Sequence, residues 1–154
     1  MRLILVAIFL SFTPFILAKS TLPASCSSFE EVIQSDLILL KKREFIELGE
    51  CVGIALLKEN RLKNLPEICS EVIENKLTPL GGLSLSKLEA IKIGQCTGII
   101  NYVYERYDSK TLKYDYSDEM FHCVKGIQAA KILTMQSDNY QSVKKVSDVL
   151  CEYY

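Results

Sequence analysis

Apolar residues recur at helical spacing in almost every segment of the chain. The spacing predicts helices over residues 28–37, 44–62, 66–77, 87–107, 118–132 and 140–151. No segment shows the sustained alternation of a β-strand, so no sheet is expected. Ser28 and Ser86 each precede a glutamate by three residues, which is the capping box of a helix start. The clearest break is Gly81-Gly82, which divides about six predicted helices into two similar halves.

Two of these helices carry the same cluster, in which a cysteine lies between two glycines. The glycines are Gly49 and Gly53 in one helix and Gly94 and Gly98 in the other. A glycine inside a helix costs roughly 1 kcal/mol relative to alanine, so four of them need a compensating reason. Glycines four residues apart share a helix face and allow another backbone to approach, while the cysteine between them points nearly the opposite way. Each helix is therefore expected to be packed on one side and cross-linked on the other.

The first residues of the chain predict a cleavable secretory signal over 1–20. Arg2 supplies a positive charge, an apolar run follows from residue 3 to 10, and the small residues Ala18 and Ser20 suit a cleavage site. The sequence is compatible with cleavage after Ser20 and with cleavage after Ala18. The alternative to a cleaved signal is an uncleaved anchor helix. We expect residues 21–154 to form one helical domain in the periplasm or outside the cell, with no stable membrane anchor after cleavage.

An even number of cysteines in an exported chain predicts disulfides. The six are Cys26, Cys51, Cys69, Cys96, Cys123 and Cys151. The last two predicted helices run antiparallel, and Cys123 and Cys151 lie at similar distances from the turn between them, so this pair is favoured. The other four cysteines allow three pairings, and their spacing does not decide among them. The expected fold class is an all-α, single-domain bundle stapled by disulfides.

Charge and motif content exclude several functions. The chain has 18 basic and 19 acidic residues and no long basic cluster, which disfavours nucleic acid as a partner. Neither the close cysteine and histidine spacing of a metal site nor a phosphate-binding glycine loop occurs. His122 is the only histidine, and it falls inside a predicted helix, where catalysis with a nucleophile is not expected. We therefore expect no enzyme, no cofactor and no metal.

The most suggestive surface is a polar stretch rich in tyrosine and aspartate between two predicted helices, at 108–118. Tyrosine is enriched at protein interfaces, where it supplies large contact area at little entropic cost. The predicted partner-binding residues are Tyr107, Asp108, Tyr114, Asp115, Tyr116 and Asp118. The alternative is a loop folded back on its own helices.

The segment Cys-x-Gly-Ile-Ile-x-Tyr-Val at 96–103, followed by Cys123 and by a valine-rich helix that ends at Cys151, resembles a known pattern. It resembles the Rap/Tai group of periplasmic immunity proteins, and the likeness covers residues 86–151. The chain departs from that group at Ile99, after Cys123 and before Cys151. The resemblance implies an exported helical protein that neutralises a cell-wall amidase delivered by type VI secretion. A secreted carrier of a small apolar ligand and a secreted effector are the alternative functions.

Overall fold

The computed structural model describes residue 26 and residues 40–77, 85–110, 120–136 and 142–153. Their elements are α2 (Lys42–Lys58), α3 (Leu65–Leu77), α5 (Lys87–Tyr107), β1 (Phe121–Cys123), α6 (Gly126–Thr134), α7 (Val143–Leu150) and β2 (Cys151–Tyr153). The described part is mostly helical, as the sequence predicts. The predicted signal, the predicted first helix and the Gly81-Gly82 break lie outside the described residues, so the count of six helices and the two similar halves stay predictions.

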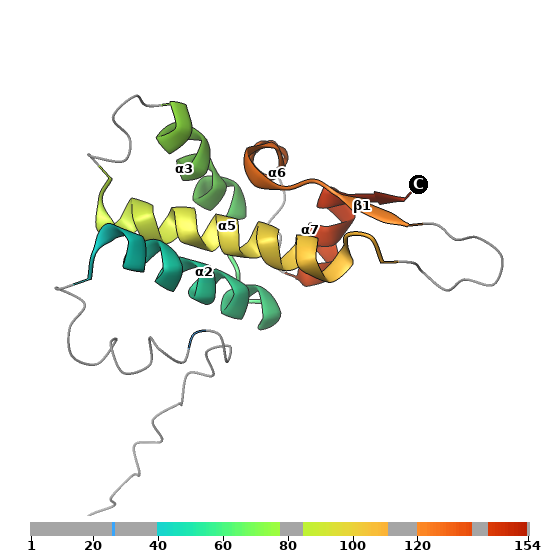
Figure 1. Cartoon of the computed structure of the whole chain (residues 1–154), viewed down its shortest axis with the longest axis horizontal. Helices are drawn as coiled ribbons and strands as arrows, with labels where there is room; N and C mark the ends of the chain where they lie inside the picture. The colour runs from blue at the N-terminus through green and yellow to red at the C-terminus, as the bar shows by residue number, and fades with distance from the viewer. Residues whose placement is uncertain (1–25, 27–39, 78–84, 111–119, 137–141, 154) are drawn as a thin grey trace, which may run out of the picture.

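Helix α5 runs through the middle of the molecule, with α2 on one side and α3 on the other (Figure 1). Its start follows the predicted capping box. The Ser86 hydroxyl accepts the Glu89 backbone N–H at 3.2 Å, and a Glu89 carboxylate oxygen accepts the Ser86 backbone N–H at 2.6 Å. Because the helix start is specified locally, the two glycines and the cysteine of α5 are placed in a fixed register.

The four cluster glycines form the contact between α2 and α5. A Cβ built on Gly98 would lie 2.6 Å from the Glu50 Cα, and one on Gly53 would lie 2.6 Å from the Gln95 backbone oxygen. Gly49 and Gly94 face the backbones of Ile91 and Ile46 in the same way. The contacts are reciprocal and advance in the same direction along both helices, which are therefore parallel. The predicted close contact on the glycine face is confirmed.

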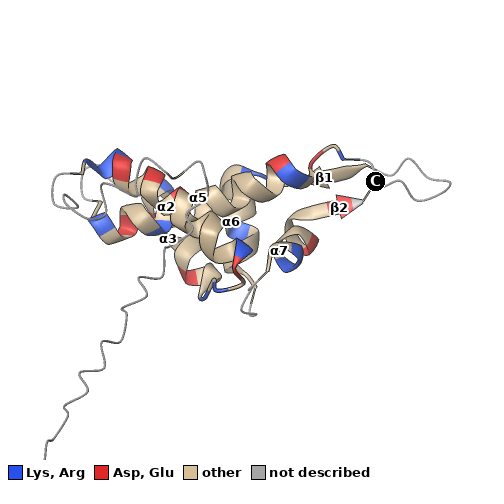
Figure 2. Ribbon diagram, turned by 90° about the horizontal axis from the view of Figure 1, so that it is seen from below, with Lys and Arg blue, Asp and Glu red and all other residues tan. Residues whose placement is uncertain are grey.

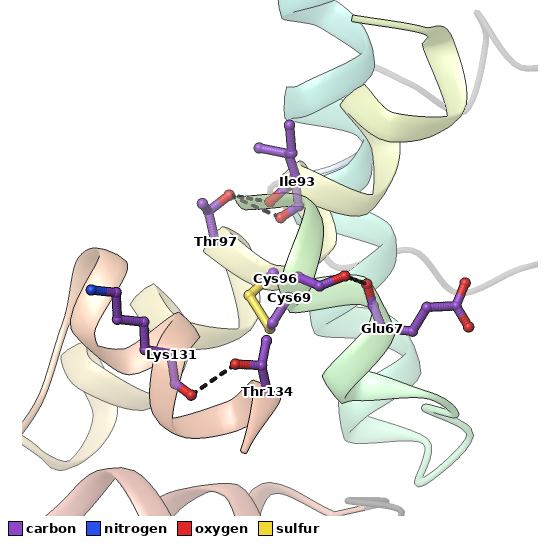
Figure 3. Close-up of a disulfide and its surroundings, with 9 residues drawn as sticks. Glu67, Cys69, Ile93, Cys96, Thr97, Lys131 and Thr134 are labelled. Carbon is purple, nitrogen blue, oxygen red and sulfur yellow. Dashed lines mark hydrogen bonds between the residues drawn. A yellow bond between two sulfur atoms is a disulfide. The ribbon is translucent and has the colours of Figure 1, made fainter. Parts of the chain in front are cut away.

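The opposite face of α5 belongs to the apolar core. Cys96 is bonded to Cys69 of α3, with a Cα–Cα distance of 5.1 Å, and α6 lies beside this bond (Figure 3). Ile99 and Val103, further along α5, are fully buried together with Leu133 of α6. A half-buried ion pair borders the core, in which the Lys92 ammonium lies 2.9 Å from Glu67 and 3.1 Å from Glu71. The hydrogen bonds that Lys92 donates to Glu67 and Glu71 raise the pKa of Lys92.

All six cysteines are bonded, as predicted. The other two disulfides join Cys26 to Cys51 and Cys123 to Cys151. Cys51 lies between the two glycines of α2, and its bond leaves the side away from α5, as the cluster pattern predicts. Disulfides of this number are typical of proteins that fold in an oxidising, exported environment. No helix in the described ranges is both long and apolar enough to cross a membrane.

The structure corrects the predicted helix over 118–132 and the expectation of no sheet. Residues 121–123 form β1, which pairs antiparallel with β2, and the helix begins only at Gly126. Cys123 lies directly opposite Cys151 in this register. The favoured disulfide is thus present, but the short sheet brings the two cysteines together rather than two antiparallel helices. Three residues are too few to show the alternation that identifies a strand.

Candidate functional site

The predicted partner-binding loop leaves the body of the molecule from a fixed base, which we call the loop base and define as residues 107–110 and 120–123. The Ser109 backbone N–H donates to the Phe121 oxygen at 2.9 Å, and the Phe121 N–H donates to the Lys110 oxygen at 3.3 Å. β1 pairs with β2 along its other edge. The two ends of the intervening segment are therefore held side by side by backbone hydrogen bonds and by a disulfide-linked strand pair.

Asp108 closes the loop base through its carboxylate. One oxygen accepts the Cys123 backbone N–H at 2.9 Å, and the other accepts the Ser109 hydroxyl at 3.2 Å. The hydrogen bond from Cys123 is the largest cause that lowers the pKa of Asp108, and the nearby His122 contributes less. The Asp108 side chain is only 15% exposed. Its charge is therefore used within the protein, and it is not free to meet a basic partner.

Tyr107 also has an internal contact. Its ring meets the Phe121 ring edge to face, with centroids 6.2 Å apart, and the Arg106 guanidinium lies 5.9 Å from its centroid. Both rings are half-buried against the core. Of the six predicted partner-binding residues, Tyr107 and Asp108 thus hold the loop base. Tyr114, Asp115, Tyr116 and Asp118 lie outside the described residues.

The exposed side of the loop base carries three residues that fall within the helix predicted over 118–132, namely Met120, Phe121 and His122. Ser109, Met120, Phe121 and His122 line a cleft of about 350 Å³. Met120 is 52% exposed, and the His122 side chain is 75% exposed. Large exposed apolar side chains next to polar ones are typical of interaction surfaces rather than of a folded core. The missed signal is Gly126, which has φ +64° and marks the true start of the helix that follows the strand.

Asp108, Ser109 and His122 lie together at the loop base, and they are the residue types of a hydrolytic triad. Their hydrogen bonds, however, do not have the arrangement that catalysis requires. The Ser109 hydroxyl donates to Asp108, and the His122 Nδ1 lies 3.8 Å from the same carboxylate. A nucleophilic serine must donate its hydroxyl proton to a general base such as histidine. The oxyanion of the transition state must be met by N–H groups that have no other hydrogen-bond acceptor. The backbone N–H groups of Ser109 and Lys110 are both bonded to carbonyl oxygens. This cluster is explained by loop-base structure.

Residues of both charge signs occur along the described helices. Lysine, arginine, aspartate and glutamate are interspersed along the helices (Figure 2). Within the described ranges, no group of three or more histidine, cysteine, aspartate or glutamate residues could hold a metal ion. At the loop base, the described residues form a cleft supported by backbone hydrogen bonds and a disulfide-linked strand pair.

The role of Asp108 predicts a pH dependence of stability. Because its folded pKa lies below the ordinary value of 3.8, its stabilisation is present above that value and is lost as pH falls through the folded pKa. We expect Asp108→Asn to be less stable than the wild type at neutral pH and to lose less on acidification to about pH 3. Urea unfolding at the two pH values measures both effects. An equal loss of stability on acidification in the wild type and in Asp108→Asn would contradict this role of Asp108.

Comparison of the chain with family models, with curated proteins and with solved structures finds no match in any of the three.

Proposed function

We propose that this chain is an exported protein-binding module that acts without turnover and presents its loop base, with the segment that joins it, to another protein. The predicted signal over 1–20 would deliver it to the periplasm or to the outside of the cell. The three disulfides suit that destination.

The observation that carries the proposal is the way the loop base is built. Four independent restraints meet within a few residues: the backbone pairing of 109–110 with 121, the Asp108 carboxylate, the Tyr107–Phe121 ring contact and the Cys123–Cys151 bond. A binding segment held by rigid ends loses less conformational entropy on association, so more of the contact energy appears as affinity. Met120 and His122 remain exposed at this support.

We take the class of partner from the resemblance of residues 86–151 to the Rap/Tai immunity proteins. In this proposal the partner is a peptidoglycan amidase, and the module blocks it by occupying the substrate cleft. Binding by a rigidly held segment accounts for inhibition without any reaction by the inhibitor itself.

The test is binding and inhibition with purified amidases delivered by type VI secretion. We expect the mature protein to bind one of them and to stop release of peptidoglycan fragments at a one-to-one ratio. Met120→Ala should weaken the complex by more than about 1 kcal/mol, since exposed apolar residues at the centre of an interface carry much of its energy. Isothermal titration calorimetry measures the change.

Met135→Ala is the matched control, because Met135 is also exposed, at 80%, but lies at the end of α6 away from the loop base. It should bind as the wild type does. A different result is that the wild type binds while Met120→Ala and a Tyr114→Ala/Tyr116→Ala double variant bind with the same affinity. That result would place the interface elsewhere. Binding without inhibition would reject the immunity function while keeping the binding module.

A further inference from the structure

A second cleft lies between α2 and α5, next to the contact that Gly98 makes with Glu50. It has a volume of about 290 Å³ and is lined by Glu50, Ile54, Lys58, Gly98, Asn101, Tyr102 and Glu105. The lining residues form one stripe on each helix. We call this cleft the α2–α5 groove. Its volume is at the lower end of the range for small-molecule sites, which suits a single side chain better than a larger ligand.

The close glycine contact holds the backbone of Glu50, a residue that lines the groove. The Glu50 backbone lies against Gly98, where an added Cβ would be 2.6 Å from the Glu50 Cα. The side chain therefore leaves the helix at the edge of the contact and is partly buried there. The Thr97 hydroxyl lies 3.3 Å from a Glu50 oxygen but is closer to the backbone oxygens of Ile93 and Gly94, at 2.9 and 3.1 Å. The Thr97 hydroxyl has one proton to share among these three acceptors, so its hydrogen bond to the Glu50 carboxylate is weak.

Among the residues that the structure describes, the Glu50 carboxylate has no ion-pair partner. Burial raises its pKa. The one ammonium in the lining, that of Lys58, lies over the Tyr102 ring at 4.9 Å from its centroid. Across the groove, Asn101 and Glu105 are exposed on α5 and supply further oxygen acceptors.

We propose that the α2–α5 groove receives an arginine side chain of the protein partner, with Glu50 as its counter-ion and Asn101 and Glu105 as additional acceptors. A guanidinium has five N–H donors in one plane and is more weakly hydrated than an ammonium, so a partly buried groove with several oxygen acceptors favours arginine over lysine. This inference rests on the proposed protein-binding function, because it assigns the guanidinium to a partner protein.

The probe for the test is N-acetyl-arginine amide, added to the isolated mature protein and followed by NMR. We expect saturable shifts of the Asn101 side-chain amide and the Thr97 backbone amide in the millimolar range. Glu50→Gln should weaken the probe by about tenfold or more, which corresponds to about 1.4 kcal/mol. N-acetyl-lysine amide should bind more weakly than the arginine probe.

Glu59→Gln removes the same charge from the exposed C-cap of α2, outside the groove, and should leave the probe affinity unchanged. A cation is attracted by ionised Glu50 and Glu105, so binding should weaken as the pH falls and these carboxylates are protonated, and Glu50→Gln should reduce this dependence. Equal probe binding by wild type and Glu50→Gln, or shifts that do not saturate, would overturn the proposal. Because no partner is present, these outcomes are independent of whether the loop base binds an amidase.

Discussion

Replacing Gly98 by leucine is expected to lower the free energy of unfolding by at least about 3 kcal/mol, at or above the upper end of the usual range for overpacking. The neighbouring atoms explain the size of the effect. A Cβ at this position would lie 2.6 Å from both the Cα and the backbone oxygen of Glu50. A flexible side chain could rotate away, whereas backbone atoms yield only if α2 moves. Chemical denaturation monitored by circular dichroism measures the change.

Gly98→Ala separates packing from helix propensity. Alanine is favoured over glycine by about 1 kcal/mol inside a helix, so an open site would become more stable. The backbone contact predicts the opposite sign, with a net loss of about 1–3 kcal/mol. Asn101→Ala, at an exposed position of the same helix, is the matched control and should be neutral or stabilising. A Gly98→Ala protein with increased stability would contradict the close approach of α2 and α5.

The helix contact could be predicted because its cause is local in sequence. Glycines four residues apart identify a face, and a cysteine halfway between them identifies the opposite face, without knowledge of the partner helix. The start of α5 could be predicted for the same reason, since Ser86 and Glu89 satisfy each other's backbone groups. The parallel direction of the pair was not predicted, because the pattern of Gly49 and Gly94 is compatible with either direction.

The loop base shows where local reasoning fails. Phe121 and Cys123 fit an apolar helix pattern, and only contacts with residues distant in sequence make them a strand. These contacts are the backbone bonds to 109–110 and the pairing with β2. Asp108 was predicted to contact a partner protein, but its carboxylate accepts a hydrogen bond from the Cys123 backbone, which is also distant in sequence. The α2–α5 groove had no sequence signal, since Glu50 and Asn101 come from separate helices and share no motif.

Removal of the Cys69–Cys96 disulfide by a double alanine substitution is expected to cost about 2–5 kcal/mol and to leave a protein close to its unfolding threshold. This bond links α3 to α5, and both cysteines are fully buried in the core. Two effects add, because the unfolded chain regains the entropy of an open loop and the core loses the packing of two sulfur atoms. Thermal and urea unfolding of the purified double variant measure the sum.

The Cys26–Cys51 bond is the control that separates these two effects. It spans 25 residues, against 27 for Cys69–Cys96, and the entropy of loop closure depends only on the logarithm of loop length. Loss of either bond should therefore release nearly the same unfolded-state entropy. Among the described residues, Cys69 and Cys96 belong to the apolar cluster between α3, α5 and α6, and Cys26 and Cys51 are buried outside that cluster. We expect the double alanine variant at 69 and 96 to be the less stable of the two. Equal stability, or the reverse order, would show that the two sulfur atoms between α3 and α5 add no more packing than those of Cys26 and Cys51 and would contradict this prediction.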